Sequence, residues 1–185
     1  MIGRIKEIRN IETGDLTGYM YNSMFVPLDT NNEIYRLIQK WIEAGNIPEP
    51  AFTNEERLEY FKNKLLNKLK TITENRLQKS TIHSTTIDKD IDAGYKALTN
   101  IDGLLSILED DTDTVEFRLA DNTFVTVTKA DLKAIKKEII LAGQEVYKTK
   151  WTIEEQINAL TDLEKAINAS IDFDNKTLVI KTAES

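Results

Sequence analysis

The sequence predicts an α+β fold, in which a small β-rich N-terminal module is followed by a mainly helical body with one β-hairpin. Aromatic-rich segments on either side of Asn22-Ser23 indicate antiparallel strands near the N-terminus. Apolar residues recur every three or four positions over much of the remaining chain, as on the buried face of a helix. A strictly alternating pattern near residues 115–127 interrupts the helices and indicates the hairpin.

The N-terminal module begins with isoleucines three residues apart, a spacing that fits a strand or a short helix and that we assign to β structure. These isoleucines are Ile2, Ile5, Ile8 and Ile11. Residues 19–21 and 24–26 then form the arms of a hairpin. Pro27 ends the second arm, because proline has no backbone N–H to donate.

A helix is predicted next. Thr30-Asn31-Asn32-Glu33 has the pattern of a capping box, in which the Thr30 hydroxyl accepts from a first-turn amide and Glu33 reaches back. Gly45 ends the helix, because glycine adopts the left-handed C-terminal conformation at little cost. The predicted apolar face consists of Ile34, Leu37, Ile38, Trp41 and Ile42.

A proline-rich segment predicts the domain boundary. Ile47-Pro48-Glu49-Pro50 favours a stiff, extended backbone. We therefore expect a module over residues 1–46 with its short helix, a linker over 47–53, and a helical body over 54–185 with the hairpin near 115–127.

The body is predicted to begin with a long helix, because Thr53 and Glu56 form a second capping box before a periodic apolar face. That face consists of Leu58, Phe61, Leu65, Leu69 and Ile72. The polar segment 80–86 breaks the helix, and a third helical pattern extends from Ile91 to Leu108, although Gly94 and Gly103 lie within it.

After the hairpin, Thr128 and Asp131 cap a helix whose apolar residues suit a helix–helix seam. These residues are Leu132, Ile135, Ile139, Ala142 and Val146. Thr152 and Glu155 form another capping box and predict a separate helix. Its inward residues are Ile157, Leu160, Leu163 and Ile167. Residues 173–180 then predict a turn and a short strand.

Charge and composition exclude several classes of function. The net charge of −7 repels phosphate, so we expect neither nucleic acid nor an anionic membrane as a partner. The absence of cysteine excludes disulfides and thiol chemistry. No apolar run approaches the roughly 20 residues of a membrane-spanning helix. The N-terminus lacks the apolar core of a signal peptide, so we expect a cytoplasmic protein or a component of a particle assembled there.

Candidate catalytic and metal-binding residues are few. His83 is the single histidine and lies in a polar segment, which favours an exposed loop residue over a general base or metal ligand. Asp88, Asp90 and Asp92 alternate as at the start of a calcium loop, but the required glycine and closing glutamate are missing, so helix capping is the better interpretation. We therefore predict no catalytic residue, metal or cofactor. An enzyme that uses paired surface carboxylates is left only as a third hypothesis.

Aromatic residues give the best indication of an interaction surface. A small hairpin cannot bury Tyr19, Tyr21 and Phe25 alone, so they pack on the helices or on another chain. Trp41 and Trp151 adjoin capping signals and apolar faces, which favours packing in the core. Our candidate interface residues are Tyr19, Tyr21, Phe25 and Trp41.

The chain resembles proteins that tailed bacteriophages encode beside, or fused to, their tail fibres. The residues that carry this resemblance are Gly18-Tyr19-Met20-Tyr21-Asn22, Val26-Pro27-Leu28-Asp29, Asn32-Glu33-Ile34-Tyr35 and the whole of residues 38–50. The rest resembles an uncharacterised domain found in the same proteins, through Phe117, Arg118, Asp121, Asn122 and the stretch 151–171. The resemblance covers residues 18–171, and the long helix departs from it by using leucine, lysine and asparagine in place of alanine.

The resemblance implies a structural or adaptor protein of the phage tail or tail fibre, without enzymatic activity. It would act through protein–protein docking, bind tail or tail-fibre proteins in several copies within a symmetric assembly, and reside in the virion after synthesis in the host cytoplasm. The alternative is a tail-fibre assembly chaperone that is not retained in the virion.

Overall fold

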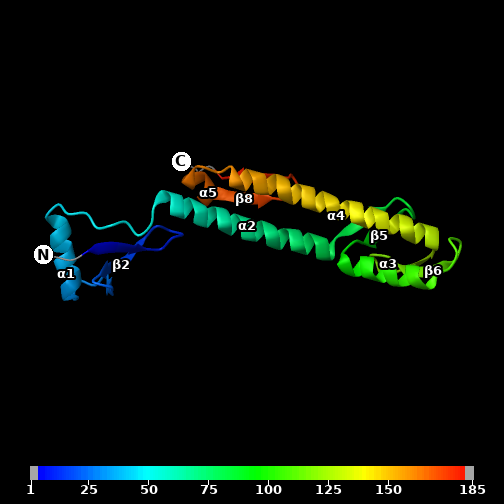
Figure 1. The fold of residues 1–185 in the computed structure, drawn as a ribbon, viewed down its shortest axis with the longest axis horizontal. Helices are drawn as coiled ribbons and strands as arrows, with labels where there is room; N and C mark the ends of the chain where they lie inside the picture. Colours follow the sequence, from blue (N-terminus) through cyan, green and yellow to red (C-terminus); the bar gives the residue numbers. More distant parts are fainter. Residues whose placement is uncertain (1–3, 182–185) are drawn as a thin grey trace. The chain divides into compact units, whose positions relative to one another are not determined.

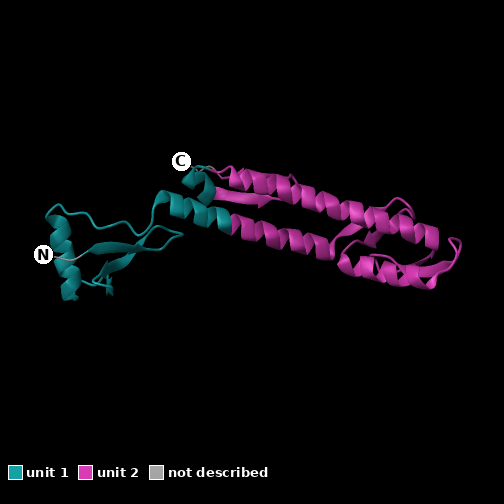
Figure 2. Ribbon diagram, viewed as in Figure 1, with its two compact units in different colours: residues 1–63, 161–167 teal, residues 64–160, 168–185 magenta. Residues whose placement is uncertain are grey.

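A computed structural model describes residues 4–181, so the predicted strand residue Ile2 lies outside the described part. The predicted α+β class is confirmed, with N-terminal strands and a mainly helical body (Figure 1). The chain divides into unit 1, residues 1–63 and 161–167, and unit 2, residues 64–160 and 168–185 (Figure 2). The domain division at residues 47–53 stays a prediction.

The elements follow one another in this order: β1 (Ile5–Arg9), β2 (Leu16–Tyr21), β3 (Met24–Pro27), α1 (Glu33–Glu43), α2 (Asn54–Lys79), β4 (Thr81–Ser84), β5 (Lys89–Asp92), α3 (Tyr95–Ile107), β6 (Thr114–Arg118), β7 (Phe124–Thr128), α4 (Lys129–Asn158), α5 (Leu163–Asn168), β8 (Ala169–Asp172) and β9 (Thr177–Ile180). Unit 1 contains β1–β3, α1, the start of α2 and all of α5 except its last residue. Unit 2 contains the rest of α2 and nearly all the other elements.

Unit 1 is built on an antiparallel sheet with the order β1-β2-β3. Asn22 and Ser23 have φ values of 47° and 64°, the left-handed pair that a two-residue hairpin turn needs, so the predicted hairpin is confirmed. Tyr19 and Val26 face each other across β2 and β3, and both are buried with Ile38 of α1.

The start of α1 differs from the prediction. Asn32 caps the helix, because its Oδ1 accepts from the backbone N–H groups of Ile34 at 2.9 Å and Tyr35 at 3.1 Å. The capping box assigned to Thr30 is wrong, since Thr30 precedes this cap by two residues. Gly45 follows the C-terminal cap with a φ of 91°, which confirms the predicted end of the helix.

The proline-rich segment is extended, and it also pairs with the sheet. The Glu7 N–H donates to the Glu49 carbonyl at 2.8 Å, and the Glu49 N–H donates to the Ile5 carbonyl at 2.9 Å. These bonds make a parallel bridge on the edge of β1 that β2 leaves unpaired. The segment around Glu49 is therefore hydrogen-bonded within unit 1.

In unit 2, α4 contacts α3, β4, β7 and β9. The box of Thr128 and Asp131 is confirmed by bonds in both directions between their side chains and backbone N–H groups. The box at Thr152 is wrong, because α4 continues through it and the Thr152 hydroxyl donates to the Lys148 carbonyl. A threonine within a helix makes this bond to the preceding turn, so the same letters need not mark a helix start.

The other differences between the predicted and the observed elements of unit 2 lie in its hairpins. The predicted hairpin is confirmed as β6 and β7. The segment predicted to break the helices forms a further hairpin, β4–β5, with Asp88 in the left-handed region at a φ of 53°. Ile91 therefore lies in a strand, and α3 begins only at Tyr95. The predicted terminal strand is confirmed as β9, paired with the unpredicted β8.

The core of unit 2 lies between α3, α4 and the strands β5, β6 and β7. Its most buried members are Ile91, Ile101, Val127, Leu132, Ile135 and Ile139. Within residues 4–181, no helix is long and apolar enough to cross a membrane.

Candidate functional site

The four predicted interface residues occupy different environments in unit 1. Tyr19 is only 4% exposed, and its ring lies 6.3 Å from that of Tyr35 on α1. Tyr21 and Trp41 are half-buried and pack against the same core. Phe25 is 51% exposed. Of the four, Phe25 is the most exposed to a partner, and the interface role itself stays a prediction.

Phe25 is one of three half-exposed apolar residues on or next to β3, which we call the β3 patch: Met24, Phe25 and Leu28. Met24 and Phe25 are consecutive in the strand, so their side chains lie on opposite faces of the sheet along this edge. The Phe25 ring lies directly over Gly18, where a Cβ atom would come within 2.6 Å of the Phe25 Cε2. The absence of a Cβ atom at Gly18 thus lets the ring pack directly against the backbone. Because β3 is the edge strand of its sheet, the patch lies beside a strand edge that no other strand of residues 4–181 pairs with.

A second exposed apolar surface lies on α4, and we call it the α4 stripe: Ile140, Gln144, Tyr147 and Trp151. The prediction that Trp151 packs in the core is wrong, since its side chain is 55% exposed. Its ring centroid lies 6.1 Å from that of Tyr147. The Tyr147 hydroxyl is 3.3 Å from the hydroxyl of Tyr95, so α3 borders the stripe.

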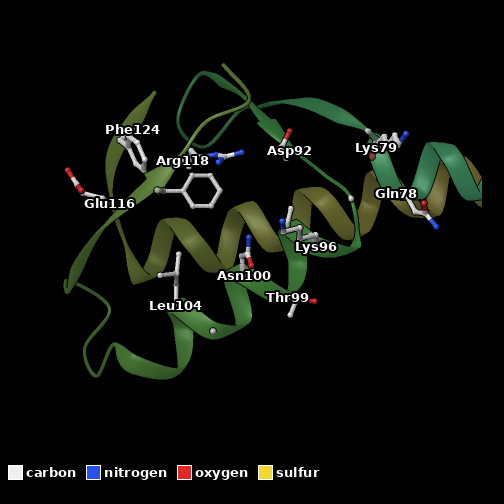
Figure 3. A pocket seen from close by; sticks show the side chains of 15 residues that line it. Gln78, Lys79, Asp92, Lys96, Thr99, Asn100, Leu104, Glu116, Arg118 and Phe124 are labelled. Carbon is white, nitrogen blue, oxygen red and sulfur yellow. The ribbon is translucent and has the colours of Figure 1, made fainter. Parts of the chain in front are cut away.

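Unit 2 also contains an open pocket of about 810 Å³ between α3, β5, β6 and the end of α2 (Figure 3). Leu104 and Phe124 give it apolar lining, and the side chains of Lys96 and Asn100 come from α3 (Figure 3). Its charged lining residues carry both signs: Lys79, Lys96, Arg118, Asp92 and Glu116. No histidine lines it, so the pocket offers polar binding groups without the usual general base.

This pocket was not found by sequence reasoning, because its residues come from segments that are far apart in the chain. Gly94 is the residue of the pocket whose type reflects the local packing. A Cβ atom there would come within 2.1 Å of the Gln78 carbonyl oxygen, so only glycine lets α3 begin so close to the end of α2. The sequence shows the glycine without showing what approaches it.

His83 is exposed, as predicted, but it belongs to a strand and not to a loop. It lies on β4, and its Nδ1 and Nε2 atoms are 2.9 Å and 3.1 Å from carboxylate oxygens of Asp90 and Asp88. The hydrogen bond with Asp90, then that with Asp88, raises the pKa of His83. The two aspartates therefore hold the histidine, and the interpretation that they cap a helix is wrong. Within residues 4–181, no cluster of three or more His, Asp or Glu side chains could hold a metal ion.

Comparison with known proteins identifies a family without a known function. Neither the curated proteins nor the solved structures contain a match. A family model described as a domain of unknown function, DUF4376, matches residues 61–174, which is more than half of the chain. The protein therefore belongs to the DUF4376 family.

Proposed function

We propose that this protein is a non-enzymatic structural or adaptor protein of a tailed-bacteriophage tail or tail fibre, and that it acts by docking onto another virion protein through the β3 patch. The resemblance of residues 18–50 to phage proteins supports the phage context. The observation that carries the docking role is the half-exposed Phe25 ring held on Gly18 at an unpaired strand edge.

The patch has the properties of a small binding anchor. An aromatic ring that is already fixed loses little conformational freedom on binding, so more of its burial energy contributes to affinity. Aromatic residues often dominate the energy of protein interfaces. Burying the exposed halves of Met24 and Phe25 is worth about 1 kcal/mol each, before any backbone pairing along β3.

The first experiment is quantitative mass spectrometry of purified phage particles. The proposal predicts this chain at a copy number that matches the symmetry of the tail or of the fibre. If the chain is abundant in infected cells and missing from particles, the virion role is wrong and a fibre-assembly chaperone becomes the better interpretation.

A set of variants tests whether the β3 patch makes the contact. Phe25→Ser is expected to reduce incorporation into particles while the circular dichroism of the purified chain stays unchanged. Leu37→Ser is the matched control, because Leu37 is an equally exposed apolar residue on α1 of the same unit. Full incorporation of Phe25→Ser would contradict the role of the patch.

A further inference from the structure

The exposed face of α4 carries two depressions that follow each other along the helix. One has a volume of about 220 Å³ and also borders Leu77 of α2 and Tyr95 and Leu98 of α3. Its lining on α4 is the buried Ile139 together with a set of four residues, Ile140, Gly143, Gln144 and Tyr147. The next has a volume of about 430 Å³ and is lined by Gln144, Tyr147, Lys148 and Trp151. Each set of four has the spacing i, i+3, i+4, i+7, which is the hole that receives one side chain of a second helix in knobs-into-holes packing.

The same face carries side chains that could fill such holes. Trp151 is 55% exposed and Tyr147 is 39% exposed, although both lie in the middle of an ordered helix. At Gly143 the missing side chain deepens the first hole. A Cβ atom there would meet Leu77 Cδ2 at 3.8 Å, an ordinary contact, so packing within unit 2 does not require glycine at this position.

Some charged residues beside the stripe form ion pairs within α4, and two do not. Near its middle, Lys148 pairs with Glu145 at 2.6 Å and Lys150 pairs with Glu154 at 2.5 Å. Lys137 and Glu155, at opposite ends, are both exposed, and neither makes an ion pair with any residue in the part of the chain that the structure describes. At 100° per residue, both lie on the same side of the stripe.

We propose that α4 binds the α4 of a second copy of this chain in an antiparallel pair, with a two-fold axis near Tyr147. Gly143 and Trp151 lie four residues to either side of Tyr147, so the pairing places each Trp151 over the Gly143 hole of the other copy. Lys137 and Glu155 lie ten and eight residues to either side, so each Lys137 comes within two residues, about 3 Å along the axis, of the Glu155 of the second copy, a gap that these long side chains span.

Pairing of two copies explains both the shape of the α4 stripe and the two charged residues beside it. The two-fold axis exchanges the Gly143 hole with the Trp151 side chain that fills it. It also brings together Lys137 and Glu155, which lie beside the stripe and make no ion pair within residues 4–181. A parallel pair would instead place the two copies of Lys137 at the same level on opposite sides of the seam, far along the axis from either Glu155. This inference uses residues of unit 2 alone and does not depend on the proposed docking of the β3 patch.

Sedimentation equilibrium of the full chain over a wide concentration range tests the proposal. The wild-type chain is expected to form dimers, and Trp151→Ala to weaken the dimer at least about tenfold. Lys137→Glu and Glu155→Lys alone are each expected to weaken it by a similar factor, because each creates two like-charge contacts. The double variant Lys137→Glu/Glu155→Lys restores both pairs in exchanged form and is expected to dimerise within about threefold of wild type.

Two variants control for net charge. Lys68→Glu and Glu116→Lys make the same charge changes at exposed positions of unit 2 outside α4, and their dimers are expected to match that of wild type. A wild-type chain that stays monomeric overturns the proposal. So does a dimer that Trp151→Ala and the single reversals leave intact, or one that the double variant fails to restore.

Discussion

Thr86 and Glu138 join the β4–β5 turn to α4. The N–H and the hydroxyl of Thr86 donate to the same Glu138 Oε1 atom, at 3.0 Å and 2.9 Å, and the Thr85 hydroxyl donates to it at 2.6 Å. The buried Ser84 hydroxyl lies nearby without meeting the geometry of a hydrogen bond. Burial raises the pKa of Glu138, but these polar neighbours favour the carboxylate and hold the pKa below its ordinary value.

Glu138→Gln is expected to lower the free energy of unfolding by about 1–3 kcal/mol at neutral pH, because it removes the charge from three hydrogen bonds. Urea denaturation followed by circular dichroism measures this loss. Glu116→Gln removes an exposed carboxylate on β6 and is expected to change the stability by less than about 0.5 kcal/mol. Equal losses in the two variants would contradict the assigned role of Glu138.

The effect of Glu138 should depend on pH. The folded pKa lies below the unfolded value of about 4.3, so the ionised side chain stabilises the fold fully above that value and loses its effect as the pH falls through the folded pKa. The difference in unfolding free energy between wild type and Glu138→Gln should therefore be constant near neutral pH and shrink in acid. A difference that grows in acid would contradict the lowered pKa.

Gly94 and Gly103 provide a matched pair at the start and in the middle of α3. Gly94→Ala is expected to destabilise unit 2 by about 1–3 kcal/mol, because the new Cβ atom would overlap the Gln78 carbonyl group. Gly103→Ala meets no atom within 4 Å and is expected to stabilise the helix by about 0.4–1 kcal/mol. Thermal unfolding measures both shifts, and shifts of the same sign would contradict the close approach at Gly94.

Local signals predicted the elements that depend on neighbouring residues. Asn22-Ser23 indicates a turn because asparagine adopts the left-handed conformation more easily than most residues, and Ser23 follows it in that conformation here. Thr128 and Asp131 cap α4 through bonds that cross only three residues. The β4–β5 hairpin lacked such a signal, since its turn uses Asp88 in the left-handed region and contains no glycine.

Which side of an element is buried depends on tertiary packing. Tyr19 pairs with Val26 and Met20 pairs with Phe25, so Tyr19 and Phe25 lie on opposite faces of their sheet. The sequence places both of these residues on one hairpin, whereas the position of α1 decides that Tyr19 is buried. Trp151 is similar, because it lies between the buried Thr149 and Ile153 and therefore points away from the face that they share.

The cap of α1 can be tested with two neighbouring residues. Asn32→Ala is expected to lower the stability of unit 1 by about 0.5–2 kcal/mol, because the Ile34 and Tyr35 amides lose their acceptor. Thr30→Ala is the control and is expected to change the stability by less than about 0.5 kcal/mol. Tryptophan fluorescence, to which Trp41 of α1 contributes, follows the unfolding. A larger loss of stability in Thr30→Ala than in Asn32→Ala would show that Thr30, and not Asn32, caps the helix.

The contacts of His83 with Asp88 and Asp90 can be tested directly, because the chain has a single histidine whose ring signals need no assignment among others. Its pKa, measured by NMR titration of the ring, is expected to lie above the ordinary value, and Asp90→Asn is expected to lower it more than Asp88→Asn. A raised folded pKa means that the protonated ring stabilises the fold below the unfolded pKa, and that this contribution is lost as the pH rises through the folded value. A His83 pKa that neither substitution changes would show that the ring is not held between the two carboxylates in solution.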